Sequence, residues 1–290
     1  MTTLSIVIPT LNAEAFIHKL ILRLNSLAKG IKFEIIIIDS DSNDSTKQKI
    51  DRLMGRYPIR FYKIKRNDFN HGTTRNFAVS LSKGKYICFV SQDALPATKD
   101  AFKFFLRDLG SKNKVVAAFA KDTPAGTVAH FLKLEYLCRY RSLDRIAKGN
   151  PLVQSKNDID QYRRKINYYG LSNVFSCYKK SFLSKNPFPK ADFGEDLLLG
   201  KIILEKGFAK LYDPRIKVIH YQRINLWSYY LRQKSDLKLR LDKMKINDSP
   251  QILCKLRNIF SEKSSLVKKA YYTLELGVYY LIKAAAYLNG

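Results

Sequence analysis

The chain has 290 residues, 46% of them apolar and 27% charged, which is the composition of a globular protein long enough to bury a sizeable core. Its 52 lysines and arginines against 25 aspartates and glutamates give a net charge of +27, which favours anionic partners: nucleic acid, an anionic membrane face or phosphorylated substrates. The four cysteines form no CxxC pair and no uncharged apolar run reaches roughly 18 residues, so neither a disulfide framework, a zinc site nor a transmembrane helix is expected.

The first 120 residues alternate short apolar runs, typical of buried parallel strands, with amphipathic helical patterns. Strands are expected at 4–8, 33–38, 60–64, 86–90 and 115–119. Helices are expected at 13–29, 44–54, 72–82 and 98–109. Such alternation predicts a doubly wound α/β sheet, whose ligand site lies beyond the carboxyl ends of the strands.

The alternation lapses after residue 120, and the basic excess is largest in the later chain. A basic amphipathic helix is expected at 127–148, an apolar stretch at 171–178, a helix at 196–206 and a strand at 217–219. We therefore predict an α/β domain over 1–220, with an insertion at 121–194, and a basic helical region over 221–290. The start of the chain lacks the features of a signal peptide, which fits the cytosol.

The last segment contains a helical stripe that is open to more than one interpretation. Its members are Val267, Tyr271, Leu274, Val278, Leu281 and Ala285. With the nearby basic residues, this stripe is consistent with docking on an anionic membrane face. A helix packed on the preceding domain, or in a homodimer interface, explains the pattern equally well.

Acidic side chains follow two of the expected strands. Asp39 comes directly after 33–38, with Asp41 close behind, and Asp93 follows 86–90. Aspartates in such turns often only cap helices. At the carboxyl edge of a parallel sheet, however, Asp39 could bind a base or ribose, and Asp93 suits Mg²⁺ or Mn²⁺, which needs few protein ligands when a diphosphate supplies the rest.

Two helix starts carry further candidates. His71 and Arg75 open the helix at 72–82, where free amides and a guanidinium favour a phosphate. Glu195 and Asp196 open the helix at 196–206, where one carboxylate could deprotonate an acceptor hydroxyl while the other binds the acceptor. Alternatively, the two acids only stabilise the helix, because negative charge is favourable at a helix N-terminus. His220, after the last expected strand, could join a metal or phosphate site.

Together these residues resemble glycosyltransferase family 2, the inverting sugar transferases of GT-A fold. SIVIPTLN at 5–12 looks like that family's first strand and loop, and DSDS at 39–42 like its nucleotide-binding turn. FNHGTTRN at 69–76, the stretch ending in SQDALP at 91–96, SNVFSCYKK at 172–180 and FGED at 193–196 are similar to motifs of bacterial rhamnosyltransferases in that family. The resemblance covers about residues 3–240.

The resemblance implies a role for each matched residue. The donor-binding residues would be Pro9, Thr10, Asn12, Asp39, Asp41, His71, Arg75 and Gln92. Asp93 would hold the divalent metal with His220 beside it, Asp196 would be the general base, and Glu195 and Asn173 would bind the acceptor. The implied donor is dTDP-L-rhamnose, with a UDP-sugar as the alternative, and the implied acceptor is a glycan or a lipid diphosphate-linked glycan at the inner membrane face.

The sequence departs from the pattern of these relatives at three places. Lys121 stands where an arginine is expected, Leu197–Leu199 replaces Trp-Ala after the acid pair, and Gln222 stands in place of a second histidine after His220. Donor or acceptor specificity could therefore differ.

Two readings from other classes compete with a transferase. A nucleic-acid-binding protein would account for the +27 charge, but it leaves the acids at the strand ends unexplained. A relative that binds nucleotide-sugars without transferring them would not need the Glu195–Asp196 pair. We therefore expect an enzyme with no nucleic-acid partner.

Overall fold

The computed structural model describes residues 2–126, 128, 130–162, 165–191, 193–222, 226–244, 259, 272–274, 276–281 and 284–285. Within them, nine strands form one mixed sheet in the order β3-β2-β1-β4-β8-β6-β9-β5, and β7 pairs with β9. The strands are β1 (Leu4–Thr10), β2 (Phe33–Asp39), β3 (Ile59–Lys63), β4 (Tyr86–Val90), β5 (Ala94–Pro96), β6 (Val115–Pro124), β7 (Leu152–Gln154), β8 (Phe175–Lys179) and β9 (Ala209–His220).

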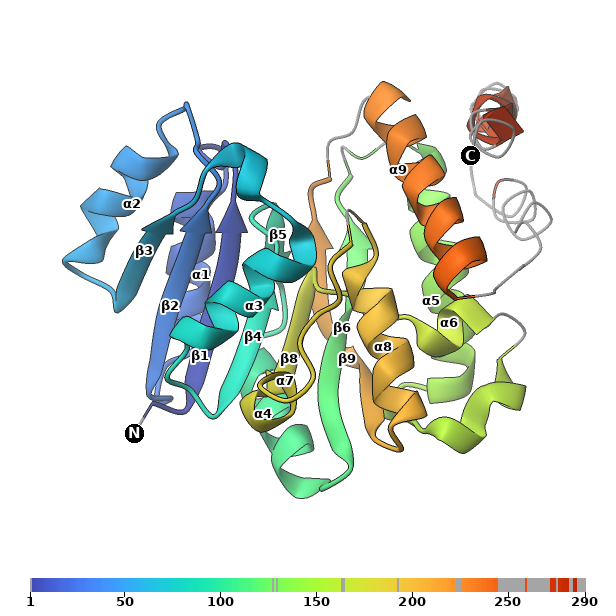
Figure 1. The fold of residues 1–290 in the computed structure, drawn as a ribbon, viewed down its shortest axis with the longest axis horizontal. Helices are drawn as coiled ribbons and strands as arrows, with labels where there is room; N and C mark the ends of the chain where they lie inside the picture. Colours follow the sequence, from blue (N-terminus) through green and yellow to red (C-terminus); the bar gives the residue numbers. More distant parts are fainter. Residues whose placement is uncertain are drawn as a thin grey trace.

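Helices cover both faces of this sheet (Figure 1). They are α1 (Ile17–Leu27), α2 (Thr46–Met54), α3 (His71–Leu81), α4 (Ala101–Ser111), α5 (His130–Ala147), α6 (Lys165–Tyr169), α7 (Lys180–Leu183), α8 (Glu195–Glu205) and α9 (Leu226–Lys238). Short 3₁₀ turns lie at Arg66–Asp68 and Lys156–Gln161, and a π-helical turn at Leu239–Lys243 follows α9.

Successive side chains along the strands point to opposite faces of the sheet and pack in two separate hydrophobic cores. In β2, Ile35 and Ile37 pack on one side with the apolar faces of α1, α2 and α4. Ile36 and Ile38 pack on the other side with α3, α5 and α8. Strands buried on both faces need continuous apolar runs, and this is the pattern from which the doubly wound sheet was predicted. That prediction is confirmed.

Two predicted elements differ from those observed. The apolar stretch at 171–178 contributes only β8, and the strand expected at 217–219 is the end of the 12-residue β9. The register of β9 on β6 shifts between Ala120 and Lys121, where Asp213-Pro214-Arg215 interrupts the apolar pattern. A bulge that contains a proline interrupts the alternation of inward and outward side chains along a strand. The sequence pattern therefore did not indicate that β9 begins at Ala209.

The sheet reverses its strand order beside β1, which pairs in parallel with both β2 and β4. The carboxyl ends of these strands meet at one edge, so the residues that follow them converge there. β8 runs antiparallel to β4, with Phe175 opposite Val90, so residues just before β8 reach the same edge.

The C-terminal region packs partly on the α/β domain. Leu276 and Tyr279 are buried in a cluster that includes Leu132 of α5 and Tyr229 of α9. Of the predicted stripe, Leu274, Val278 and Leu281 expose 71%, 43% and 71% of their surface, and Val267 and Tyr271 lie outside the described residues. Among the described helices, none is long and apolar enough to cross a membrane.

Candidate active site

The turn after β2 is organised by Asp39. Its buried carboxylate accepts hydrogen bonds from the Thr10 hydroxyl (2.9 Å) and from the backbone N–H (2.9 Å) and hydroxyl (2.6 Å) of Ser42. Thr10 and Asp39 are register partners at the ends of β1 and β2. Asp39 therefore fixes the shape of this turn, and its contact with a nucleobase stays a prediction.

Asn12 and Asp41 both adopt left-handed backbone conformations, with φ of 51° and 65°. Asn and Asp tolerate this region better than most residues. The Asn12 side chain accepts a hydrogen bond from the N–H of Asn43 (3.0 Å), which joins the loops after β1 and β2. Asp41 pairs with Lys63 (2.6 Å), whose hydrogen bond and charge lower the pKa of Asp41, so an ionised carboxylate stands at the rim of the turn.

Gln92 joins the ends of β1 and β4. Its side-chain oxygen accepts from the N–H of Leu11 (2.7 Å), and its side-chain nitrogen donates to the carbonyl of Leu11 (2.8 Å). Gln92 thereby positions the loop that follows Pro9 and Thr10. These two hydrogen bonds account for the amide side chain of Gln92 at the position before Asp93.

Asp93 and His220 form a pair at the same edge of the sheet. Nε2 of His220 lies 3.2 Å from Oδ1 of Asp93, and Nδ1 of His220 lies 2.6 Å from the hydroxyl of Tyr136 on α5. β5 and β9 bring the pair together, because Ala94 is the register partner of His220. Burial opposes ionisation of Asp93, but the hydrogen bond and charge of His220 hold the pKa of Asp93 below its usual value.

Asn173 holds the two acids at the start of α8. Its side-chain nitrogen donates to Glu195 (3.0 Å) and its backbone N–H donates to Asp196 (3.3 Å). Its side-chain oxygen accepts from Ser176 (2.9 Å) and Tyr178 (2.7 Å) of β8. Asn173, two residues before β8, thus orients both carboxylates, and its predicted contact with an acceptor stays a prediction.

The two acids have opposite pKa shifts. Burial opposes ionisation of Glu195, but Arg75, His71 and Asn173 hold the pKa of Glu195 below its usual value, with Arg75 at 2.9 Å. Burial and the charge of Glu195 raise the pKa of Asp196 to about 6. Adjacent carboxylates with separated pKa values are typical of a site with a charged binding group and a proton acceptor.

The start of α3 carries Arg75 to this pair. Asn70 caps the helix by accepting from the N–H of Gly72 (3.1 Å), and Arg75 donates to the carbonyl of His71 (3.0 Å). A Cβ atom at Gly72 would lie 2.1 Å from the carbonyl oxygen of Pro189. Only glycine lets α3 come so close to the segment that precedes α8.

The Asp93 and Asp196 clusters adjoin each other. The N–H of Ser91 donates to the carbonyl of Val174 (3.0 Å), which places Asp93 two residues beyond this contact and Asn173 one residue before it. The predicted metal residues Asp93 and His220 and the predicted acceptor residue Asn173 therefore lie at the ends of neighbouring strands, and Asn173 joins them to the two acids at the start of α8.

Each departure from the family pattern has a local partner. Lys121 pairs with Asp144 of α5, and Gln222 accepts from Tyr136 (3.3 Å). Leu197 and Leu198 pack against Leu239 of the π-helical turn, in a buried cluster beside the acid pair.

Sequence reasoning missed Tyr136 and Arg139, which face the site from α5. Tyr136 holds the His220 ring, and the Arg139 guanidinium donates to the carbonyl of Leu171 (2.9 Å) and opposes the rise in the pKa of Asp196. The sequence did predict a basic amphipathic helix here, and Tyr136 and Arg139 lie three residues apart on one face of it. The helical period alone, however, does not indicate which part of the protein that face contacts.

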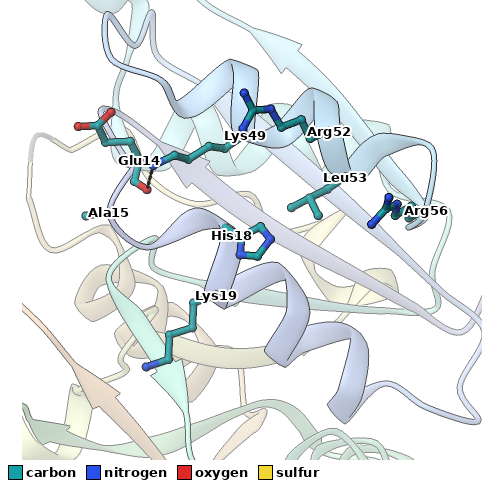
Figure 2. A pocket seen from close by; sticks show the side chains of 8 residues that line it. All are labelled: Glu14, Ala15, His18, Lys19, Lys49, Arg52, Leu53 and Arg56. Atoms are coloured by element: carbon teal, nitrogen blue, oxygen red, sulfur yellow. Dashed lines mark hydrogen bonds between the residues drawn. The ribbon is translucent and has the colours of Figure 1, made fainter.

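A hollow of about 710 Å³ between α1 and α2 lies apart from these clusters (Figure 2). Its lining residues are Glu14, Ala15, His18, Lys19, Lys49, Arg52, Leu53 and Arg56. Glu14 accepts hydrogen bonds from Ser45 at the end of the Asp39 turn, including one of 3.1 Å from the Ser45 N–H. None of the predicted site residues lines this hollow.

The family model described as glycosyl transferase family 2 matches residues 5–183, and the chain belongs to this family. It is similar to two O-antigen chain rhamnosyltransferases: WbaN of Salmonella anatum, 29% identical over 194 residues, and RfbN of Salmonella typhimurium, 29% identical over 190 residues. Each match covers 64% of this chain and 56% of the relative, so the chain spans about half the length of these relatives.

Solved structures of similar fold extend the match over nearly the whole chain. The Staphylococcus aureus protein TarS, residues 1–349, in complex with UDP-GlcNAc, gives a TM-score of 0.54 at 17% identity, covering 93% of this chain and 70% of that one. The mannosyltransferase PcManGT of Pyrobaculum calidifontis, in complex with GDP-Man and Mn²⁺, gives 0.59 at 14% identity, covering 99% and 75%. The predicted GT-A fold is confirmed by these neighbours.

Proposed function

We propose that the protein is an inverting glycosyltransferase that moves L-rhamnose from dTDP-L-rhamnose to a glycan or lipid-linked glycan in bacterial surface polysaccharide synthesis. One observation carries the reaction type: an acid pair with separated pKa values, buried Glu195 and half-buried Asp196, adjoins a carboxylate–imidazole pair at the carboxyl edge of the sheet. The sugar is suggested by the similarity to the two O-antigen chain rhamnosyltransferases.

The chain's residues suit a single-displacement reaction. Asp196 accepts the proton of the acceptor hydroxyl as that oxygen attacks C1 of the sugar. The bond from C1 to the diphosphate oxygen breaks on the opposite face, and its electron pair leaves with the nucleoside diphosphate. Glu195, kept ionised by Arg75, is suited to accept a hydrogen bond from another hydroxyl of the acceptor.

A divalent cation fits Asp93 and His220. Among the described residues no group of three or more His, Cys, Asp and Glu side chains gathers, so the chain would offer these two ligands and the donor diphosphate the rest. The fit rests on the donor set, a carboxylate and an imidazole whose other nitrogen is held by Tyr136. Bound Mg²⁺ or Mn²⁺ would neutralise charge on the departing diphosphate.

The donor is tested by incubating the protein with Mn²⁺, oligosaccharide acceptors and a panel of nucleotide-sugars. We expect transfer from dTDP-L-rhamnose at a kcat/KM at least about tenfold above that of UDP-GlcNAc, UDP-glucose or GDP-mannose. Transfer from a UDP-sugar alone would keep the reaction class and reject rhamnose. Nucleic-acid binding without transfer from any donor would reject the enzyme.

We also propose that the C-terminal helix docks on an anionic membrane face, where a lipid-linked acceptor would lie. Leu274, Val278 and Leu281 recur at helical spacing and are exposed, in a region with 13 basic and 5 acidic residues over 221–290. Exposed apolar side chains beside excess positive charge match an anionic lipid surface. Exposed Trp227 of α9, stacked on Tyr230, suits the same interface.

The double variant Leu274→Asp/Leu281→Asp is expected to lose most of its sedimentation with vesicles containing phosphatidylglycerol, because two charges enter the apolar stripe. Leu22→Asp on α1, where the leucine is 40% exposed, is the matched control and should sediment like the wild type. Unchanged vesicle binding by the double variant would reject the membrane proposal. A shift from dimer to monomer in light scattering, without loss of vesicle binding, would assign the stripe to a homodimer.

A further inference from the structure

Arg232 of α9, in the basic C-terminal region, reaches the loop that leads into α8. Its guanidinium carbon lies 4.8 Å from the centre of the Phe193 ring, and Phe193 is followed by Gly194, Glu195 and Asp196. A guanidinium stacked on an aromatic face is held in place without consuming its hydrogen-bond donors. Phe193, which lies just before the two acids, therefore holds the Arg232 guanidinium in place.

The π-helical turn after α9 is packed on the same loop. Gly194 has a φ of 75°, and a Cβ atom there would lie 2.6 Å from the Leu239 side chain. Leu239 is buried with Leu197 and Leu198 of α8. This close contact couples the position of α9, and hence of Arg232, to the start of α8.

The charge of Arg232 acts on the carboxylate of Asp93 and on Tyr136, which bonds His220. Within the described part of the chain, no hydrogen bond or ion pair joins the Arg232 side chain to another residue, and this side chain is only half-buried. Its five N–H donors remain available for an anion.

We infer that Arg232 binds the diphosphate of the nucleotide donor and product, across the site from Asp93. This inference rests on the proposed function, because it takes the ligand to be a nucleoside diphosphate. A planar guanidinium matches two phosphate oxygens at once, and its fixed charge would stabilise the diphosphate as it leaves. In the family pattern an arginine stands at the position of Lys121 and a second histidine follows His220. Here Lys121 is paired with Asp144, and Arg232 supplies a cation from α9 instead.

Binding of nucleotides without any acceptor tests the inference by isothermal titration calorimetry with saturating Mn²⁺. The probes are dTDP and dTMP, with UDP and UMP in parallel. Arg232→Ala should weaken dTDP binding by about tenfold to a hundredfold, since a charged hydrogen-bonding pair is lost, and leave dTMP binding within about twofold. Arg232→Lys should recover part of the loss.

Lys238→Ala is the matched control, because Lys238 is an exposed cation on the same helix. It should bind dTDP like the wild type, and melting temperatures of all variants should agree if the fold is intact. Equal weakening of dTDP and dTMP by Arg232→Ala would assign the residue to packing on Phe193 and overturn the inference. Unchanged dTDP binding would overturn it while the proposed function stands, whereas a wild type that binds no nucleotide would overturn both.

Discussion

Replacing Asp196 with asparagine is expected to lower kcat by about a hundredfold to ten-thousandfold while the affinity for the nucleotide changes little. The substitution removes the proton acceptor. It keeps one of the two oxygens, which accept separately from the N–H of Asn173 (3.3 Å) and the N–H of Leu197 (2.8 Å), so one of these two hydrogen bonds can still form. General-base catalysis is typically worth this range. The measurement is steady-state transfer together with calorimetric binding of the nucleoside diphosphate.

The matched control is Glu205→Gln, at the far end of the same helix, where the side chain pairs with Lys201 at 3.6 Å on the surface. It changes the same charge and should keep wild-type activity. If Asp196→Asn retained full kcat, Asp196 would not be the base, although the family assignment would stand.

The pH profile gives an independent readout of the same residue. Because burial and Glu195 raise the pKa of Asp196 to about 6, the base is protonated below that pH and ionised above it. In the wild type, kcat/KM should therefore fall about tenfold for each pH unit below 6 and be flat just above it. An acidic limb centred near pH 4 would contradict the raised pKa of Asp196.

Replacing Asp93 with asparagine is expected to abolish the dependence of nucleotide binding on a divalent cation. Asp93 is the only carboxylate that contacts His220 within the described residues, and a neutral amide is a poor ligand for Mg²⁺ or Mn²⁺. Wild-type protein should bind dTDP more tightly as Mn²⁺ rises and lose activity in a chelator. Asp93→Asn should bind dTDP equally with and without Mn²⁺, and its kcat/KM should fall at least about a hundredfold.

Asp100→Asn is the control for the loss of one negative charge close to Asp93 in the sequence. Asp100 forms an exposed ion pair with Lys103 at 3.0 Å. Its Mn²⁺ response should match the wild type. An unchanged Mn²⁺ response in Asp93→Asn would show that the cation binds elsewhere, and unchanged wild-type activity in a chelator would show that no cation is needed.

The N-terminal half of the fold could be predicted because its strands are buried on both faces. Such strands read as continuous apolar runs, and an acid at the end of each run is conspicuous. Asp39 and Asp93 were found in this way, and β1, β2 and β4 do bring them to one edge of the sheet. The resemblance to a family was needed to single out Asn173, which anchors the acid pair through its side chain and backbone.

Residues on helices were harder to find because their partners are distant in sequence. Tyr136 meets His220 across 84 positions, and Arg232 meets Phe193 through the packing of α9 on the start of α8. No local pattern encodes which face of a basic helix is turned inward. The C-terminal region was predicted only as a basic helical region, and no pattern in the sequence indicated that α9 reaches the loop before α8.

The anomeric configuration of the product tests the central claim most directly. Wild-type protein is incubated with Mn²⁺, an oligosaccharide acceptor and the nucleotide-sugar that it uses, and the one-bond carbon–proton coupling at C1 of the transferred sugar is read by NMR. A single displacement with Asp196 as the base predicts the configuration opposite to that of the donor. A product with the donor's configuration would contradict this account, and so would a protein that transfers no sugar from any donor.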